Sequence, residues 1–566
     1  MSGRKILVIH MSRLGDTIQG LPALKLLNEE NPGCSITYLG IENFCVLLKG
    51  SPWIDRLVAV PWQEVREIAG KESEKDTDAP KRFFNSIPEL GERYDLLVNL
   101  THDRNSGYLS KKVNAEEKAG RIFSKNDEIV VSGDWGKYLF ALAKNRKDNL
   151  LNLVDLYMGM AGVRNRPVYD FLPPNPERDR KCAVFLEESG IDFGRPVIGF
   201  QLGANMAARR WPVKHFADLG RSLVDKFDAQ IVLFGSPGER RLADAFRSIV
   251  QFPFVDLAGK TALPDLPSFF RNIDLLVGND TGPMHIASAV GTGTVGVFMS
   301  TAFSGITGPY GAGNVAVQSR YPCFPCLDDT VCCDPLCRRD ITPEAVLHGV
   351  RLALVPDEVE SDCDVGADIY VSSFRSDGTL RYELKGGRTD RFLPWLTSFG
   401  YAKAEIGQAL WNRWLGIENA SHEGGFGKNA RYLSIISDFR KACRSFGDIY
   451  ERGMDASRRI LGEFSRKKPN LRLVQGMAEL LARGEEEIRS MEGPLPILKE
   501  MHEFYMYETE ICDFPKLARE FMKTYGKMTE ILRCFETVLG EIETPSADSE
   551  PEKFSGACLH PDTVSF

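Results

Sequence analysis

Acidic, basic and glycine residues follow strand-like runs at four places in the sequence, where they could bind a diphosphate and take up a proton. The first place is HMSRLGDTIQGLPAL, residues 10–24, where a strand-like run ends and Asp16 opens a helical pattern. The carboxyl ends of parallel strands face the ligand crevice, so a carboxylate here can take a proton from an acceptor hydroxyl. Alternatively, Asp16 with Gln19 forms a helix cap, and the positive helix end lowers its basicity.

The second place is a helix start suited to a diphosphate. In LVGNDTGPMHIASAVGT, residues 276–292, Asp280, Thr281 and Gly282 follow a strand, and a proline stands in the first helical turn. Free N–H groups at such a helix start bind phosphate oxygens, and His285 could donate a further hydrogen bond. The alternative is that Asp280 and Thr281 only cap the helix while His285 packs in the core.

Two further strand ends carry polar groups. In QLGANMAARRWP, residues 201–212, the guanidinium groups of Arg209 and Arg210 can neutralise a leaving diphosphate, or else lie solvated on the surface. In FGSPGERR, residues 234–241, Glu239 follows a strand and a glycine turn, where a carboxylate can accept hydrogen bonds from a ribose. Glutamate is also common in the first turn of any helix. Asp16 as a base and the arginines as partners of a leaving diphosphate would act from opposite sides, an arrangement that needs no catalytic metal.

A repeated strand-and-helix pattern must position these groups. It predicts an α/β fold with two parallel layers, separated by the proline-rich stretch at 171–177. The expected strands are 5–10, 35–39, 57–60 and 95–100 in the first layer, and 196–202, 230–234 and 273–277 in the second. The expected helices are 17–30, 212–227 and 343–354.

The rest of the chain has a different composition. Residues 356–367 are acidic and read as a linker, and residues 369–384 alternate around Asp377-Gly378, which predicts a hairpin. Long helical patterns follow to about residue 540. The predicted domains are residues 1–175 on the acceptor side, 176–355 on the nucleotide-sugar side, the linker 356–367, a hairpin with a helical bundle at 368–540, and a flexible tail at 541–566.

Composition excludes several classes of protein. With 566 residues, 43% hydrophobic and 26% charged, the chain is neither collagen-like nor wholly disordered. The 70 Lys and Arg against 78 Asp and Glu give a net charge of −8, which argues against a dedicated nucleic-acid binder. No apolar run is long enough for a membrane helix or an export signal, so we expect a cytoplasmic protein with peripheral membrane contact left open.

Cysteines are concentrated in one segment. Five of the 13 lie in YPCFPCLDDTVCCDPLC, namely Cys323, Cys326, Cys332, Cys333 and Cys337. Four of these thiols could hold a structural zinc or iron. Reduced structural thiols or a disulfide are the alternatives.

The four motifs taken together are similar to those of a known family. SRLGDTIQGLPAL, LGAN followed by RRWP, FGSPGE, and GNDTGPMHIASA resemble glycosyltransferase family 9, the heptosyltransferases of lipopolysaccharide inner-core assembly. The resemblance covers residues 1 to about 354. It implies a bacterial-type enzyme with the GT-B architecture, in which two Rossmann-like layers face each other across a cleft, and inverting transfer of a heptose from an ADP-activated donor.

The resemblance also implies roles for single residues. Asp16 matches the family's catalytic base, and Arg209 stands where many members have lysine, an exchange that keeps the charge but changes phosphate geometry. The implied donor-binding residues are Gly203, Asn205, Arg210, Glu239, Asp280, Thr281, Gly282 and His285. Within this set, the backbone of residues 280–282 with His285 matches the diphosphate site, and Glu239 matches the ribose-contacting acid. Some relatives carry cysteines at the position of the cluster, and the protein-modifying autotransporter heptosyltransferases hold iron with such thiols.

The acceptor is less defined than the donor. Residues 101–125 carry six basic against three acidic side chains, a local excess of +3 that suits an anionic glycan, a glycolipid or a membrane surface, or else belongs to a solvated helix face. A lipopolysaccharide core or another surface glycan is the expected acceptor. A protein acceptor, or a non-catalytic GT-B scaffold that recruits partners, is the alternative. The region beyond residue 368 departs from the family and could mediate self-association.

Overall fold

The computed structural model describes residues 3–61, 87–101, 104–123, 129–132, 134–141, 151–321, 324–326, 332, 336–356, 365–386 and 430–464, with a few positions between 477 and 532. The chain divides into two compact units, residues 1–394 and 395–566, which are described separately.

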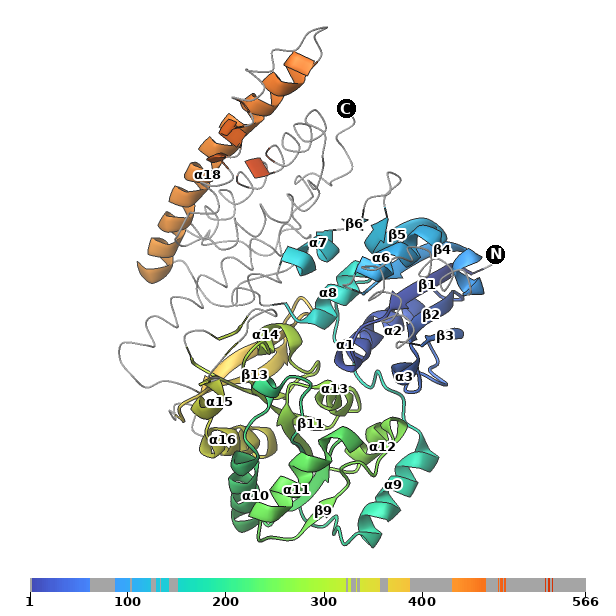
Figure 1. The fold of residues 1–566 in the computed structure, drawn as a ribbon, viewed down its shortest axis with the longest axis vertical. Helices are drawn as coiled ribbons and strands as arrows, with labels where there is room; N and C mark the ends of the chain where they lie inside the picture. The colour runs from blue at the N-terminus through green and yellow to red at the C-terminus, as the bar shows by residue number, and fades with distance from the viewer. Residues whose placement is uncertain are drawn as a thin grey trace, which may run out of the picture. The chain divides into compact units, whose positions relative to one another are not determined.

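The first layer of the larger unit is a six-stranded sheet (Figure 1). Its central strand is β1, in which five successive residues, 6–10, are buried, as expected for a strand covered on both faces. The strands are β1 (Lys5–His10), β2 (Ser35–Ile41), β3 (Arg56–Val60), β4 (Arg93–Asn99), β5 (Asn114–Phe123) and β6 (Ile129–Ser132). They lie in the order β3-β2-β1-β4-β5-β6 and are parallel except for β6. The four strands predicted for this layer are confirmed.

The helix expected at 17–30 is two helices. They are α1 (Leu14–Gln19) and α2 (Leu21–Glu30), separated by Gly20, with Pro22 in the first turn of α2. Proline has no N–H and fits only a first turn, so the second helix has to begin there. The other helices of this layer are α3 (Glu42–Cys45), η1 (Pro88–Gly91), α6 (Arg104–Lys112), α7 (Asp134–Ala141) and α8 (Leu153–Met160).

The second layer is an eight-stranded sheet in the order β14-β13-β12-β11-β10-β7-β8-β9. Its parallel strands are β7 (Val197–Gln201), β8 (Gln230–Phe234), β9 (Phe254–Asp256), β10 (Leu275–Asn279), β11 (Gly293–Phe298) and β12 (Val315–Gln318). Its helices are α9 (Pro176–Glu188), η3 (Ala207–Arg209), α10 (Val213–Phe227), η4 (Pro237–Glu239), α11 (Arg240–Ile249), η5 (Leu263–Asp265), α12 (Leu266–Arg271), α13 (Gly282–Ala289), α14 (Ser304–Thr307), α15 (Cys337–Asp340) and α16 (Pro343–Leu354).

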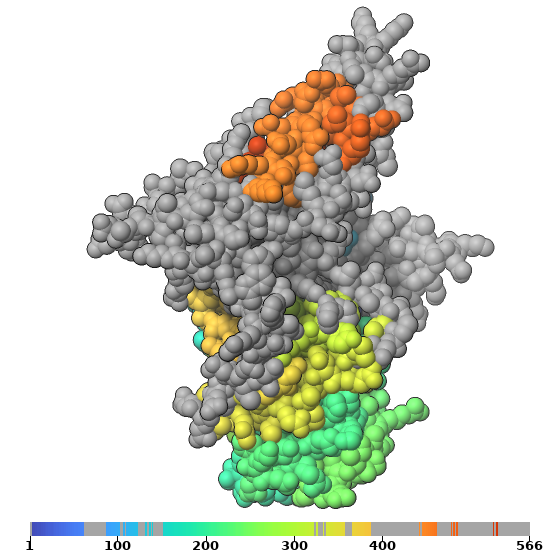
Figure 2. All heavy atoms as spheres, turned by 90° about the vertical axis from the view of Figure 1, so that its left-hand side faces the viewer, coloured from blue at the N-terminus to red at the C-terminus, as the bar shows by residue number. Residues whose placement is uncertain are grey.

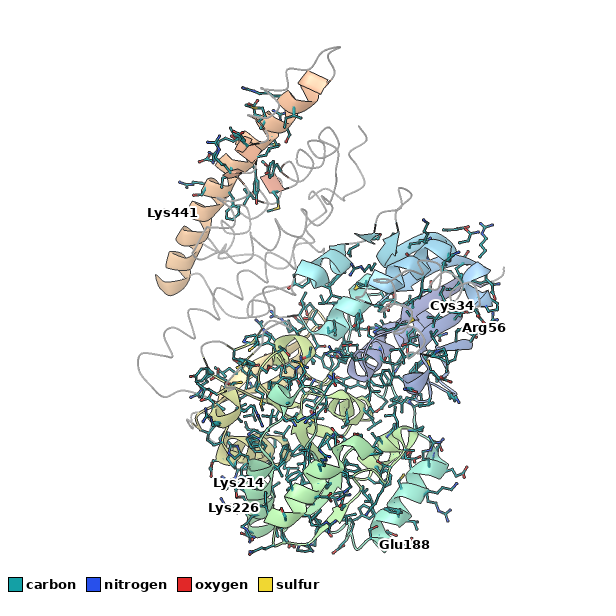
Figure 3. The ribbon with its side chains drawn as sticks, viewed as in Figure 1. Cys34, Arg56, Glu188, Lys214, Lys226 and Lys441 are labelled. Carbon is teal, nitrogen blue, oxygen red and sulfur yellow. The ribbon has the colours of Figure 1, made fainter. Side chains whose placement is uncertain are left out.

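Charged side chains line the outer side of this layer. Lys214 and Lys226 lie along α10 and Glu188 ends α9 (Figure 3). Such exposed charges are typical of helix faces turned to solvent.

The predicted hairpin is present, but it belongs to the second sheet. Strands β13 (Asp368–Phe374) and β14 (Leu380–Gly386) pair with each other, and β13 also pairs antiparallel with β12, placing Val371 opposite Val315. The sequence predicts this hairpin as part of the helical region at 368–540, and the pairing of β13 with β12 shows that this prediction is wrong. The hairpin instead covers the edge of β12, whose unpaired backbone groups would otherwise be exposed. Figure 2 shows the hairpin strands in gold beside the green and yellow remainder of the layer.

The two layers share one hydrophobic core. A single cluster of buried side chains includes Ile6 and Val8 of β1 together with Phe234 and Met284 of the second layer. Helix α8 adds polar links to the second layer, since Asn152 Nδ2 donates to the carbonyl of Gly308 at 2.9 Å. The shared core and this hydrogen bond hold the two layers of the larger unit against each other.

The smaller unit is described mainly by α18 (Ala430–Phe464). Phe446, Ile449, Tyr450 and Ile460 are buried on this helix, which agrees with the predicted helical spacing. Apart from a few positions between 477 and 532, the remainder of the predicted bundle and the tail at 541–566 lie outside the described residues. In the described part of the chain, no helix combines the length and apolar character needed to cross a membrane.

Candidate functional site

The site is built where α1 of the first layer packs against α13 of the second (Figure 1). The backbone approach is close: a Cβ atom on Gly15 would lie 2.8 Å from His285 Cδ2, and one on Gly282 would lie 2.6 Å from Leu14 Cδ2. Both glycines are required by space, because real Cβ contacts are longer. Asp16 follows Gly15 directly, so the first and second sequence motifs meet at one interface.

Asp16 is the third residue of α1 and is half-buried. Its Oδ2 accepts a hydrogen bond from the N–H of Arg13 at 3.2 Å. Asp16 therefore does help to cap α1, as the alternative proposed. Gln19 takes no part in this cap and is buried at the end of α1. No hydrogen bond to Oδ1 is found among the described residues, so this oxygen can accept one from a substrate hydroxyl.

Asp280 connects several groups at the end of β10. It is 7% exposed, its Oδ2 accepts from Thr307 Oγ1 at 3.2 Å and lies 3.5 Å from Arg209 Nη1, and its Oδ1 lies 3.6 Å from His285 Nε2. Its carboxylate thus orients an arginine and a histidine rather than capping α13.

The start of α13 carries no side-chain cap. Thr281 is the N-cap residue, but its hydroxyl donates to the carbonyl of Asn279 at 3.2 Å. The capping alternative for Asp280 and Thr281 is therefore wrong. An uncapped helix start presents backbone N–H groups and positive potential to an anion.

Arg209 and Arg210 are both half-buried, which contradicts the solvated-surface alternative. Arg209 Nε donates to Thr301 Oγ1 at 2.6 Å. Arg210 Nε donates to the carbonyl of Ala204 at 2.7 Å and so holds the turn after β7. Of the two, Arg209 is the one that the structure brings to Asp280.

Glu239 lies beside the turn at 203–205. Its Oε2 accepts from the N–H and hydroxyl of Ser236 at 2.7 and 2.9 Å and from Gln201 Nε2 at 3.3 Å. A Cβ atom on Gly203 would stand 1.4 Å from Glu239 Oε1. Asn205, in the same turn, is exposed. Glu239 therefore does cap the start of a helix, as the alternative proposed. The hydrogen bonds from Ser236 hold its carboxylate against the turn at 203–205.

Asn279 is a buried organiser that sequence reasoning missed. Its Oδ1 accepts from the N–H of Trp211 at 2.9 Å, and its Nδ2 donates to the carbonyls of Leu202 and Gly203 at 2.9 and 3.2 Å. One amide thus ties the end of β10 to both ends of the 203–210 loop. The sequence feature that could have revealed it is an uncharged polar residue at the end of a buried strand, directly before Asp280.

The basic stretch at 101–125 is not one helix face. It forms α6 and β5, and Glu117 pairs with Arg4 while Glu116 pairs with Arg93. Lys118 Nζ donates to the carbonyl of Ser110 at 2.8 Å, and burial lowers the pKa of Lys118.

The cysteine segment is only partly described. Cys326 is half-buried, Cys332 exposed and Cys337 buried. Cys323 and Cys333 lie outside the described residues. Within the described ranges, no group of three or more potential ligand residues comes together.

Comparison with known proteins decides the family. The sequence profile of glycosyltransferase family 9 (heptosyltransferase) matches residues 86–336. This part of the chain belongs to glycosyltransferase family 9. The chain is therefore a glycosyltransferase, and the predicted GT-B arrangement of two Rossmann-like layers is confirmed.

Similar proteins support this assignment. A putative glycosyltransferase of Haemophilus influenzae is 25% identical over 53% of this chain and 84% of its own length. Lipopolysaccharide heptosyltransferase 1 of Pseudomonas aeruginosa is 24% identical over 58% of this chain and 88% of its own length. The crystal structure of a family 9 glycosyltransferase from Veillonella parvula aligns with 63% of this chain and 99% of its own, with 20% identity and a TM-score of 0.52, so the two share a fold.

Proposed function

We propose that this glycosyltransferase moves a heptose from an ADP-heptose donor to a hydroxyl of a lipopolysaccharide core or a similar surface glycan. The observation that carries the proposal is the packing of Gly15, next to Asp16, against His285 in the first turn of α13. A candidate base and a candidate diphosphate site therefore face one another. The name of the Pseudomonas aeruginosa relative, lipopolysaccharide heptosyltransferase 1, supports the donor sugar and the acceptor.

In this scheme the second layer binds the donor. The uncapped N–H groups at the start of α13 and the guanidinium of Arg209 contact the diphosphate. Glu239 Oε1 accepts from the ribose, and the turn containing Gly203 and Asn205 closes over the nucleoside. Arg210 keeps that turn in place through the carbonyl of Ala204.

Asp16 acts on the acceptor side. Its Oδ1 takes the proton of the acceptor hydroxyl as the oxygen bonds to the anomeric carbon, while the bond from that carbon to the ADP oxygen breaks. The electron pair leaves with ADP, and Arg209, His285 and the α13 N–H groups stabilise the added negative charge. Attack opposite the leaving group inverts the anomeric carbon.

Replacing Asp16 by asparagine tests the proposal. Asp16→Asn keeps an oxygen for the N–H of Arg13 but cannot take a proton, so turnover should fall by about 100-fold or more. ADP affinity, measured by calorimetry, should stay within about twofold. Unchanged turnover would contradict the base assignment, and absence of ADP binding by the native protein would contradict the donor assignment.

The remaining expectations belong to the same proposal. We infer a cytoplasmic enzyme with peripheral membrane contact at an anionic acceptor, and self-association through the unit at 395–566. Structural zinc or iron at the cysteine segment is testable by elemental analysis of purified protein, and no step above uses a metal.

A further inference from the structure

We propose that Thr301 is a positioning residue that holds Arg209 in the orientation needed for the leaving diphosphate. The inference rests on the proposed function and deepens it. Thr301 is 2% exposed and lies just beyond β11, on a different loop from Arg209. The two meet through the 2.6 Å hydrogen bond from Arg209 Nε to Thr301 Oγ1.

The backbone before Thr301 is adapted to present this hydroxyl. Ser300 is buried yet has a φ of 58°, a left-handed conformation that costs free energy for a residue with a side chain. The turn is held by the N–H of Cys326, which donates to the Ser300 carbonyl at 2.8 Å. Such strain persists only where the surroundings impose it, and it is concentrated at functional sites.

The hydroxyl also fixes the loop that carries the arginine. Thr301 Oγ1 lies 3.9 Å from Met206 Sδ as a weak donor while it accepts from Arg209 Nε. Met206 and Arg209 are already linked by a backbone hydrogen bond of 3.0 Å from the N–H of Arg209. One side chain thus contacts both ends of this short turn.

The chemistry of the pair suits binding of a phosphate. A hydroxyl is neutral, so it orients the guanidinium without cancelling its charge, whereas the Asp280 carboxylate stays at 3.5 Å and is shared with Thr307 and His285. No hydrogen bond from Nη2 is found among the described residues. An arginine fixed along its Nε edge can offer this outer nitrogen to an anion at little further cost in side-chain entropy.

This arrangement also explains why arginine works at residue 209. A lysine has no equivalent of the Nε–H group and could not form the lateral bond to Thr301 while its ammonium reached a phosphate. Thr301 and Arg209 therefore act as a pair.

The test is a double-mutant cycle with Thr301→Val, Thr301→Ser and Arg209→Met, measured by ADP calorimetry and by kcat and KM with ADP-heptose. Thr301→Val should lower kcat/KM and weaken ADP binding by about 10-fold or more, the size expected for a lost hydrogen bond to a charged group. Thr301→Ser, which keeps the hydroxyl, should recover most of both. In the Arg209→Met background, Thr301→Val should have almost no further effect.

Thr292→Val is the matched control, because its buried hydroxyl donates to the carbonyl of Phe270 at 2.6 Å, near the opposite end of β11. This variant should lose stability but keep its activity per folded molecule. An active native enzyme in which Thr301→Val has no effect, or has an equal effect without Arg209, would overturn the positioning role alone. A native protein that binds no ADP would overturn the proposed function as well.

Discussion

The carboxylate of Glu239 lies where the Cβ atom of any other amino acid at Gly203 would have to stand, because that atom would be 1.4 Å from Oε1. The carboxylate cannot move aside without losing the hydrogen bonds that Oε2 accepts from Ser236. The backbone of Gly203 and the carboxylate of Glu239 are therefore in direct contact. This contact is possible only because residue 203 has no side chain.

Replacing Gly203 by alanine should weaken ADP binding. The added methyl group must displace either Glu239 or the turn, and loss of one hydrogen bond to a carboxylate raises the dissociation constant by about 10-fold or more. Calorimetry with ADP measures this. Gly91→Ala is the control, since nothing lies within 4 Å of a Cβ atom there, and equal affinities in all three proteins would contradict the assignment of Glu239 to the donor.

Asp155 on α8 should make the protein less stable as the pH rises. Its Oδ2 accepts from the N–H of Leu380 at 3.0 Å, while Oδ1 has no hydrogen-bond partner among the described residues. Burial raises the pKa of Asp155 well above its ordinary value of 3.8. The folded state therefore binds this proton more tightly than the unfolded state, and the stability it gives is lost as the pH rises through the folded pKa.

Asp155→Asn keeps an acceptor oxygen and stays neutral. Its melting temperature should therefore fall less than that of the native protein between mildly acidic and mildly alkaline pH, as calorimetry or circular dichroism would show. Asp155→Leu leaves the N–H of Leu380 unpaired and should destabilise at every pH. A native-like pH dependence in Asp155→Asn would show that this carboxyl does not titrate as argued.

Asp256 should have the opposite effect on stability. Burial raises its pKa, but hydrogen bonds from Arg240 and Arg247 outweigh burial and lower the pKa from 3.8 to about 2. The pKa of Asp256 is lower in the folded state than in the unfolded state. The stability that its ionised carboxylate contributes is therefore present above about pH 3.8 and is lost as the pH falls toward 2.

Asp256→Asn should cost about 2 kcal/mol of unfolding free energy at neutral pH, measured by denaturant titration, and the cost should shrink in acid. Asp244→Asn is the control, because that residue pairs with Arg240 at the exposed surface and should change stability little. A loss that is the same at neutral and acidic pH would point to packing instead of charge.

Much of the fold could be predicted because apolar runs mark buried parallel strands directly. The boundaries of β1 and α16 agree with the sequence interpretation. The break at Gly20 was missed because the helical spacing continues across it, and only Pro22 signals the second start. The location of the hairpin was missed for another reason: its pairing with β12 depends on contacts between residues more than 50 positions apart, such as Val315 and Val371.

The candidate site was predicted unevenly. Motifs at strand ends led to Asp16, Asp280 and Glu239, because topology alone brings strand ends together. The hydrogen bond between Arg209 and Thr301 joins residues 92 positions apart and depends on the strained turn at Ser300. No local sequence pattern predicts such a contact. Asn279 was overlooked because its role is to satisfy three backbone groups, which only coordinates reveal.

The attachment of β14 bears on where the transferase part can be cut. Leu380 donates to Asp155, so a chain ended after Val355 would lose the partner of a buried carboxylate and uncover β12 along its length. A truncated protein meant to keep catalysis should therefore extend through Gly386. The glycosyltransferase part and the added C-terminal sequence overlap by one hairpin, and removing the appendage at the apparent family boundary would damage the enzyme itself.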